Sequence, residues 1–229
     1  MDSYRKTAII VGVLFIIATV SAILTIGILG TTLDPSEYLT DVEANETQVV
    51  LAVIFWLILA VSVLGIGVMM YPLLKKYHGG LAQGYVALRL VETICIVISS
   101  ICLMSLLTMS KEFGAGTMDA SYYQPVGSVL LALQDWSFAI GTLIFLGLGG
   151  LALYYGLYEL QLVPKWLSLW GLIGAACIAF YGLLSLFGLT ADSVILNILA
   201  APIAVQEMVF AVYLIVKGFK PQVIKSKSG

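Results

Sequence analysis

Four ionisable side chains lie inside long apolar stretches of the sequence, where a charge is costly. They are Arg89, Glu92, Asp135 and Glu207. Insertion scales put a charged residue at the centre of a membrane helix at roughly 2.5–3.5 kcal/mol, so such residues normally face a bundle interior, pair with one another or line a wet cavity. Their chemistry would be proton exchange or the binding of a small polar ligand. These four residues are therefore our candidate ligand- or proton-binding residues.

The spacing and charge of these residues suggest how they would interact. Arg89 and Glu92 are three residues apart, which places them on one helix face within reach of each other. One guanidinium faces three carboxyl groups, so a fully ionised cluster would carry a net charge of about −2 in a poorly solvated place. Either one or two carboxyl groups are protonated, or a cationic ligand completes the balance. A planar guanidinium can join carboxylates from different helices, which makes Arg89 the expected hub.

Uncharged polar residues accompany the charged ones within the same apolar stretches. These residues are Ser99, Gln134, Thr142, Asn197 and Gln206. Because they recur at helical spacing, they predict polar stripes on three helices. Three such stripes indicate one shared polar interior.

The elements that position these residues must be membrane helices. The 229 residues are 61% hydrophobic and 10% charged, with a mean hydropathy of +1.05, which excludes soluble folds, nucleic-acid-binding modules and disulfide scaffolds. A span needs about 20 apolar residues. Six stretches qualify, at about 7–30, 49–74, 81–109, 127–158, 166–187 and 197–217. The predicted fold is an all-α, polytopic bundle of six transmembrane helices in a single domain, residues 1–229, whose long fourth helix tilts or projects.

Lysine and arginine residues indicate the orientation of the bundle. In this arrangement only Lys111 falls on one side of the membrane, and the other loops and termini carry the remaining flanking charges, which are Arg5, Lys6, Lys75, Lys76, Lys165, Lys217, Lys220, Lys225 and Lys227. Cytoplasmic loops carry an excess of such residues, so both termini are expected in the cytoplasm. Tyrosine and tryptophan residues are expected to mark the two interfaces. On the inner side these are Tyr71, Tyr77, Tyr154, Tyr155, Tyr158 and Trp166, and on the outer side they are Tyr38, Tyr122 and Tyr123.

Small residues predict where helices approach one another closely. Gly171, Ala175 and Ala179 follow at four-residue steps, and small residues of this kind let membrane helices pack backbone to backbone. The stripe forms a helix contact, and it also offers a contact for a homodimer. Gly147 and its neighbours form a second such position or a flexible point.

No catalytic group, metal site or cofactor is predicted. His78 is the single histidine, so a zinc site rich in histidine is excluded, and its position in a basic turn argues against a serine-histidine pair at membrane depth. Cys95, Cys102 and Cys177 are odd in number and lie in apolar stretches, where they are read as packing residues.

Several segments together resemble a known family. They are Gly84-Tyr85-Val86-Ala87-Leu88-Arg89-Leu90-Val91-Glu92, Gln134-Asp135-Trp136, Val163-Pro164-Lys165-Trp166-Leu167-Ser168, Trp170-Gly171-Leu172-Ile173-Gly174, and Glu207 before Lys217-Gly218-Phe219. The chain resembles, over nearly its whole length, a prokaryotic family of six-helix membrane proteins known as a domain of unknown function. The resemblance implies a bacterial or archaeal inner-membrane protein in which the four charged positions are typical of the family. It implies no activity, substrate or cofactor.

Three hypotheses about function follow. The first is a small proton-coupled carrier, in which Glu92 and Glu207 exchange protons and Arg89 holds an anionic group or balances a carboxylate. The second is a non-transporting partner, a sensor or a stress or immunity factor, in which the charged cluster is a clamp between helices. The third, a membrane enzyme with Glu92 or Asp135 as a general base, has the least support, since no nucleophile and base pair is visible. The expected partners are the lipid bilayer, a small molecule or ion, and a second copy of the chain.

Overall fold

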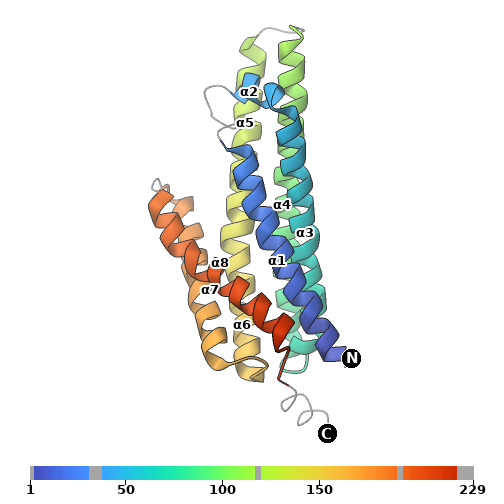
Figure 1. Ribbon diagram of the computed structural model, residues 1–229. Helices are drawn as coiled ribbons and strands as arrows, with labels where there is room; N and C mark the ends of the chain where they lie inside the picture. The colour runs from blue at the N-terminus through green and yellow to red at the C-terminus, as the bar shows by residue number, and fades with distance from the viewer. Residues whose placement is uncertain (1–2, 31–37, 117–119, 190–192, 221–229) are drawn as a thin grey trace.

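The computed structural model describes residues 3–30, 38–116, 120–189 and 193–220, which form helices joined by short turns (Figure 1). The helices are α1 (Ser3–Leu29), α2 (Tyr38–Ala44), α3 (Glu46–Leu74), α4 (Gly79–Gly114), α5 (Ala120–Ala139), the π-helical η1 (Ile140–Phe145), α6 (Leu146–Leu160), α7 (Lys165–Leu186) and α8 (Ser193–Val216). No strand occurs in the ranges just given. Six spans are long and apolar enough to cross a membrane, with α5, η1 and α6 forming one of them. The predicted all-α fold with six membrane helices is confirmed.

The six spans pack as a ring of neighbours. α1 packs against α3, α3 against α4, α4 against α5, η1 and α6, α6 against α7, α7 against α8, and α8 returns to α1. Large apolar side chains point outward from this ring, among them Ile26, Val61, Ile101 and Ile173, each at least 60% exposed. An apolar exterior of this extent suits a protein whose surroundings are lipid. The protein is a multi-pass membrane protein.

Both ends of the described chain lie at the same end of the bundle (Figure 1). Arg5 at the start of α1 donates hydrogen bonds to the carbonyl oxygens of Leu214, at 3.2 Å, and Ile215, at 2.6 Å, at the end of α8. A cation at that position also complements the negative end of the helix dipole. We call this the basic end, because the helix ends and turns there carry Lys6, Lys75, Lys76, Lys165, Lys217 and Lys220. Lys225 and Lys227 lie outside the described residues, and the cytoplasmic location of the basic end stays a prediction.

The opposite end, which we call the far end, carries a small projection. α4 continues to Gly114 rather than ending near 109, and α5 begins at Ala120 rather than near 127, so the two helices extend beyond α1, α7 and α8 (Figure 1). α2 packs on this projection. The Tyr38 hydroxyl donates to the carbonyl oxygen of Gln124 at 2.9 Å. Tyr38 and Tyr123 are expected at this end as interfacial residues; they lie there but are buried in the contact.

Small residues join α6 and α7. A Cβ atom added to Gly147 would lie 2.8 Å from the carbonyl oxygen of Ala175 and 2.6 Å from Cβ of Ala179, and one added to Gly150 would lie 2.9 Å from Cβ of Ala175. The prediction that the stripe with Ala175 and Ala179 is a helix contact is confirmed. The suggestion that it serves a homodimer is wrong, because α6 of the same chain covers it and leaves both alanines buried.

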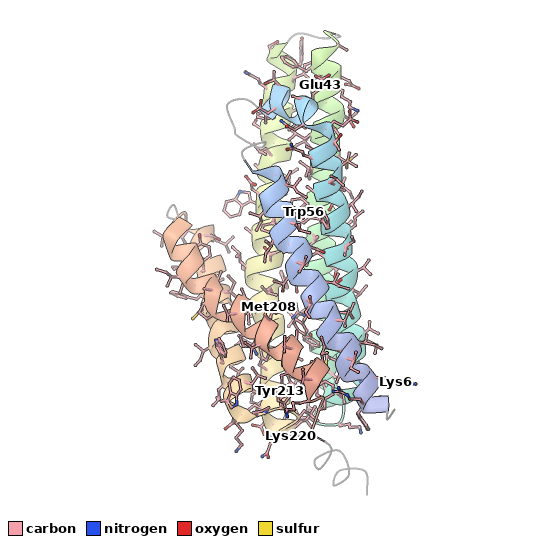
Figure 2. All side chains as sticks on the ribbon, in the orientation of Figure 1. Lys6, Glu43, Trp56, Met208, Tyr213 and Lys220 are labelled. Carbon is pink, nitrogen blue, oxygen red and sulfur yellow. The ribbon has the colours of Figure 1, made fainter. Side chains whose placement is uncertain are left out.

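α8 meets α1 closely at one level and then leaves it. Near the basic end, a Cβ atom on Gly12 would lie 2.7 Å from the carbonyl oxygen of Ala211, and the rings of Phe15 and Phe210 meet edge to face at 5.4 Å. Toward the far end α7 and α8 lean away from α1, beginning at about the level of Met208 (Figures 1 and 2). The backbones of α1 and α8 therefore approach each other most closely in the basic half of the bundle.

Candidate functional site

Arg89 crosses the interior of the bundle between two glycines of neighbouring helices. It lies on α4 and is 1% exposed. A Cβ atom on Gly67 of α3 would lie 3.1 Å from Cβ of Arg89, and one on Gly149 of α6 would lie 3.5 Å from its Nε atom. Gly67 leaves room for the arginine side chain where a Cβ atom would crowd it, whereas a Cβ atom at Gly149 would make ordinary van der Waals contact. The packing of three helices positions the guanidinium.

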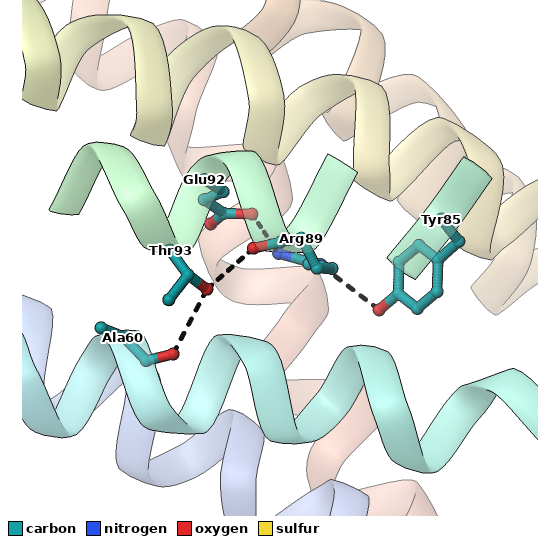
Figure 3. Close-up of polar contacts among 5 residues, drawn as sticks. All are labelled: Ala60, Tyr85, Arg89, Glu92 and Thr93. Atoms are coloured by element: carbon teal, nitrogen blue, oxygen red, sulfur yellow. Dashed lines mark hydrogen bonds and ion pairs between the residues drawn. The ribbon is translucent and has the colours of Figure 1, made fainter. Parts of the chain in front are cut away.

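The guanidinium is held by two neighbours on its own helix (Figure 3). Nη1 of Arg89 donates to Oε2 of Glu92 at 2.8 Å, and Nε donates to the hydroxyl of Tyr85 at 3.2 Å. Glu92 is 2% exposed and Tyr85 is fully buried. The contact between Arg89 and Glu92 that their spacing suggests is therefore present, and it lies within one helix rather than between two.

The backbone beside this pair is fixed to the adjacent helix. The Thr93 hydroxyl lies 2.8 Å from the carbonyl oxygen of Arg89, to which it donates, and 3.4 Å from that of Ala60 on α3 (Figure 3). Threonine hydroxyls in helices commonly bond to the carbonyl one turn earlier. The second contact draws α3 and α4 together at the level of the ion pair.

Glu207 of α8 faces the same guanidinium from a different helix. Electrostatic interactions link Glu207 with Arg89, Glu92, Tyr85 and Tyr154. Glu207 is half-buried and makes no hydrogen bond or ion pair with the described residues. The Nη2 atom of Arg89 is buried and also has no partner among them. Arg89 therefore interacts electrostatically with two carboxyl groups, as a hub would, but binds only one of them directly.

Asp135 lies apart from these three residues. It is exposed on α5, and its neighbour Gln134 is buried in its place. The backbone carbonyl of Gln134 accepts a hydrogen bond of 3.1 Å from the Ser99 hydroxyl, while its side-chain Oε1 has no partner among the described residues. Consecutive helix positions differ by about 100°, so only one of the two can face α4. The structure brings together Arg89, Glu92 and Glu207 but not Asp135.

Tyr154 belongs to the site although its sequence position suggests an interfacial residue. It is fully buried on α6, its ring lies 5.8 Å from that of Phe210, and Gly171 of α7 packs against it. Its hydroxyl has no hydrogen-bond partner among the described residues. The prediction of an interfacial ring is wrong for Tyr154. The signal that could have found it is the helical spacing of Gly147, Gly150 and Tyr154, which places all three on one face.

The π-helical turn η1 packs beside Glu92. A Cβ atom on Gly141 of η1 would lie 2.6 Å from Cβ of Cys95 and 3.5 Å from the carbonyl oxygen of Glu92. π-helical turns are rare and occur frequently at functional sites. No sequence pattern predicts this turn, because the long fourth span appears in the sequence as one continuous helix.

Comparison with known proteins gives a family. Residues 10–218 match the family model described as Domain of unknown function (DUF4386). The chain belongs to this family. The resemblance noted in the sequence is confirmed, and DUF4386 carries no assigned activity that could be transferred. No curated protein and no solved structure matches the chain.

The arrangement in this DUF4386 protein limits the chemistry that the site can perform. A guanidinium keeps its positive charge in proteins. The ionised form of Glu92 compensates that charge, and an ionised Glu207 would give the three residues a net charge of about −1. Within the described ranges, no three His, Cys, Asp or Glu side chains gather as a metal site would require. The site is suited to accepting one proton or one small cation at Glu207.

Proposed function

We propose that the protein is a small proton-coupled carrier whose coupling site consists of Arg89, Glu92 and Glu207. The observation that supports the proposal is that only one of the two carboxyl groups is bonded to Arg89. Glu92 is bonded to Arg89 at 2.8 Å, whereas Glu207 has no bonded partner among the described residues. A carboxyl group that is uncompensated at membrane depth gains from taking up a proton or a cation.

The position of Glu207 supports exchange with the surroundings. It is half-buried and lies one residue from Met208, where α8 begins to lean away from α1. A carrier must expose its coupling group to each side of the membrane in turn, usually by rocking one set of helices against another. α7 and α8 are the pair whose movement would change the surroundings of Glu207.

The alternative is a non-transporting sensor or assembly partner in which the charges only fix the helix register. A clamp between helices needs an ion pair that joins them, but Arg89 and Glu92 lie on the same helix. Only Glu207 could complete such a clamp, and it forms no direct contact with Arg89. The carrier is therefore the better supported of the two.

The proposal places the single domain of residues 1–229 in the cytoplasmic membrane of a prokaryote, with the basic end in the cytoplasm. The excess of lysine at that end supports this orientation. A small molecule or ion is the partner, and a homodimer would have to use a surface other than the α7 stripe.

The experiment measures water access to the charged positions from each side of the membrane. Single cysteines are introduced as Glu92→Cys, Asp135→Cys and Glu207→Cys and labelled in oriented vesicles with a membrane-impermeant thiol reagent. The background carries three substitutions, which are Cys95→Ala, Cys102→Ala and Cys177→Ala. Val61→Cys serves as the matched control, because this side chain is 70% exposed on the apolar exterior and should not react from either side.

We expect Glu207→Cys to react from both sides, whereas Val61→Cys should react from neither. That result would justify transport assays in the same vesicles. Protein that folds and inserts but reacts at neither Glu92→Cys nor Glu207→Cys from either side would refute the carrier and favour the partner.

A further inference from the structure

Five buried side-chain polar atoms lack a hydrogen-bond partner within the described residues, and three of them lie in the part of the bundle formed by α6, α7 and α8. These three are the hydroxyl oxygen of Tyr154, Oε1 of Gln206 and Oγ of Ser168, and each residue is 0% exposed. They come from three different helices, α6, α8 and α7. A buried polar atom without a partner costs about 1–3 kcal/mol, so a cluster of three needs an explanation.

Ser168 is the most informative of the three. Other buried serine residues bond to backbone carbonyls. Ser62 donates to Ile58 at 2.8 Å and Ser100 to Ile96 at 2.9 Å within their own helices, and Ser99 donates to Gln134 of α5 at 3.1 Å. Ser168 makes no such bond; it is the fourth residue of α7, and the residue one turn earlier is Pro164, which precedes the helix. Its hydroxyl is therefore available to a group other than its own helix.

Gln206 connects Ser168 with Glu207. Its Nε2 donates to the carbonyl oxygen of Leu167, the residue before Ser168, at 3.1 Å. This bond fixes the amide against α7 and leaves Oε1 as an acceptor without a donor. Glu207 is the next residue on α8. The Gln206 side chain also lies beside the Tyr154 hydroxyl, near hydrogen-bonding reach but without the geometry of a formed bond.

By position along their helices, Ser168 and Tyr154 lie closer to the basic end than the charged site does, and Gln206 lies beside Glu207. Ser168 lies three residues into α7, about 5 Å from its start at the basic end, and Arg89 lies ten residues into α4, about 15 Å from its start. The apolar neighbours of Tyr154, including Phe210, Phe15 and Leu214, otherwise fill this region. Buried polar atoms without protein partners are the positions at which internal water molecules bind in proteins.

We propose that Ser168, Gln206 and Tyr154 line an internal water chain that carries protons between the basic end and Glu207. A proton taken from the solution at the basic end would reach the Glu207 carboxylate by successive transfers. Each water molecule or hydroxyl group gives up its own proton as it receives another, so neither is changed, and Oε1 of Gln206 holds a water by accepting its hydrogen bond. The titratable or charged groups that face Glu207 are Arg89, Glu92, Tyr85 and Tyr154. This inference rests on the proposed function and assigns it a path.

The path is tested by the rate at which the Glu207 carboxyl group exchanges its proton for deuterium. Infrared difference spectra of the full-length protein in lipid nanodiscs, moved from H2O to D2O, report the carboxyl C=O band, which is assigned to Glu207 by its absence in Glu207→Gln. The test variants are Ser168→Ala and Gln206→Leu. Ser100→Ala is the matched control, because Ser100 is equally buried but its hydroxyl is bonded within α4.

We expect both test variants to slow the exchange by about tenfold or more, which corresponds to about 1.4 kcal/mol on the barrier, and the control to leave it unchanged. Exchange as fast in both test variants as in Ser100→Ala would overturn the path while leaving Glu207 as the coupling group. If the spectra contain no band that is lost in Glu207→Gln, the proposed function fails as well. Because the band verifies a folded site in each variant, slow exchange cannot be confused with misfolding.

Discussion

Removing both carboxyl groups that face Arg89 is expected to destabilise the protein far more than the two single changes together. In Glu92→Gln, the amide oxygen can still accept the 2.8 Å bond from Arg89, and Glu207 still balances the charge, so we expect a loss of about 1 kcal/mol. In Glu207→Gln, no existing bond is broken, and the loss should be smaller still. Either carboxyl group can therefore replace the other as the counter-charge.

In the double variant, neither position can supply a counter-charge to Arg89. Arg89 is 1% exposed and keeps its proton, so Glu92→Gln with Glu207→Gln leaves a buried cation without any counter-charge. Breaking a buried ion pair in this way costs about 3–5 kcal/mol. The coupling energy between the two positions should thus reach about 2 kcal/mol, well above the average of about 0.6 kcal/mol for polar contacts in membrane proteins.

The measurement is the free energy of unfolding in mixed micelles of denaturing and non-denaturing detergent, for the parent, the two single variants and the double variant. The control cycle combines Glu92→Gln with Glu46→Gln, because Glu46 pairs with Lys111 at 2.5 Å on the exposed projection, far from Arg89. The control cycle should be additive. If the Glu92 and Glu207 cycle is also additive within about 0.5 kcal/mol, Arg89 does not depend on the two carboxyl groups, and the account of the site is wrong.

Three further outcomes follow from the packing and from the basic end. Gly147→Ala should lower the melting temperature markedly, since its Cβ would meet α7 backbone at 2.8 Å, whereas Gly149→Ala, whose Cβ has 3.5 Å to Arg89, should be tolerated in the same thermal assay. Arg5→Ala removes the hydrogen bonds that join α1 to the end of α8, and hydrogen exchange at the last turn of α8 should become faster. The hydrogen bond with Tyr155 raises the pKa of Tyr77 from 10 to about 12, so the neutral form of Tyr77 is favoured up to that pH. Ultraviolet titration should detect an ionisation near pH 12, and this ionisation should move toward pH 10 in Tyr155→Phe.

Hydropathy and charge were sufficient to predict the membrane fold because lipid leaves the backbone so few choices. Twenty or more apolar residues without polar partners must form a helix, and six such stretches must form six spans. The same reasoning cannot predict α2 or the projecting ends of α4 and α5. Those segments contain polar residues, and their helical state depends on contacts such as the one between Tyr38 and Gln124, which are far apart in sequence.

The site could be predicted in part, for a similar reason. The contact between Arg89 and Glu92 depends only on helical spacing and is therefore visible in the sequence. The inward position of Glu207 follows from its cost in lipid. The same cost gave the wrong expectation that Asp135 would join the cluster, because Gln134 and Asp135 are adjacent and the sequence does not indicate which of them faces α4.

Tyr154 shows a second limit of the sequence. Tyrosine near the end of a span is typical of the membrane interface, and Tyr155 follows that rule, with 44% of its surface exposed and its hydroxyl 3.3 Å from that of Tyr77. Tyr154, one residue earlier, faces the opposite way into the core. Hydropathy indicates how deep in the membrane a residue lies. The packing of the helices determines whether its side chain faces the core or the surroundings.

Gln206 and Glu207 are consecutive residues on α8 whose side chains interact with different helices. Gln206 faces α7 and holds the carbonyl of Leu167, whereas Glu207 interacts electrostatically with Arg89. Because the two side chains belong to consecutive residues, any rotation of α8 moves both at once. A rotation of α8 relative to α7 that changes the distance between Glu207 and Arg89 would therefore also strain or break the Gln206 bond to α7, whereas a movement of α7 and α8 together would keep that bond. Protonation of Glu207 would weaken its attraction to Arg89 and so favour an arrangement in which the two residues lie farther apart. In the proposed carrier, the Gln206 bond thus favours a joint movement of α7 and α8 in response to protonation.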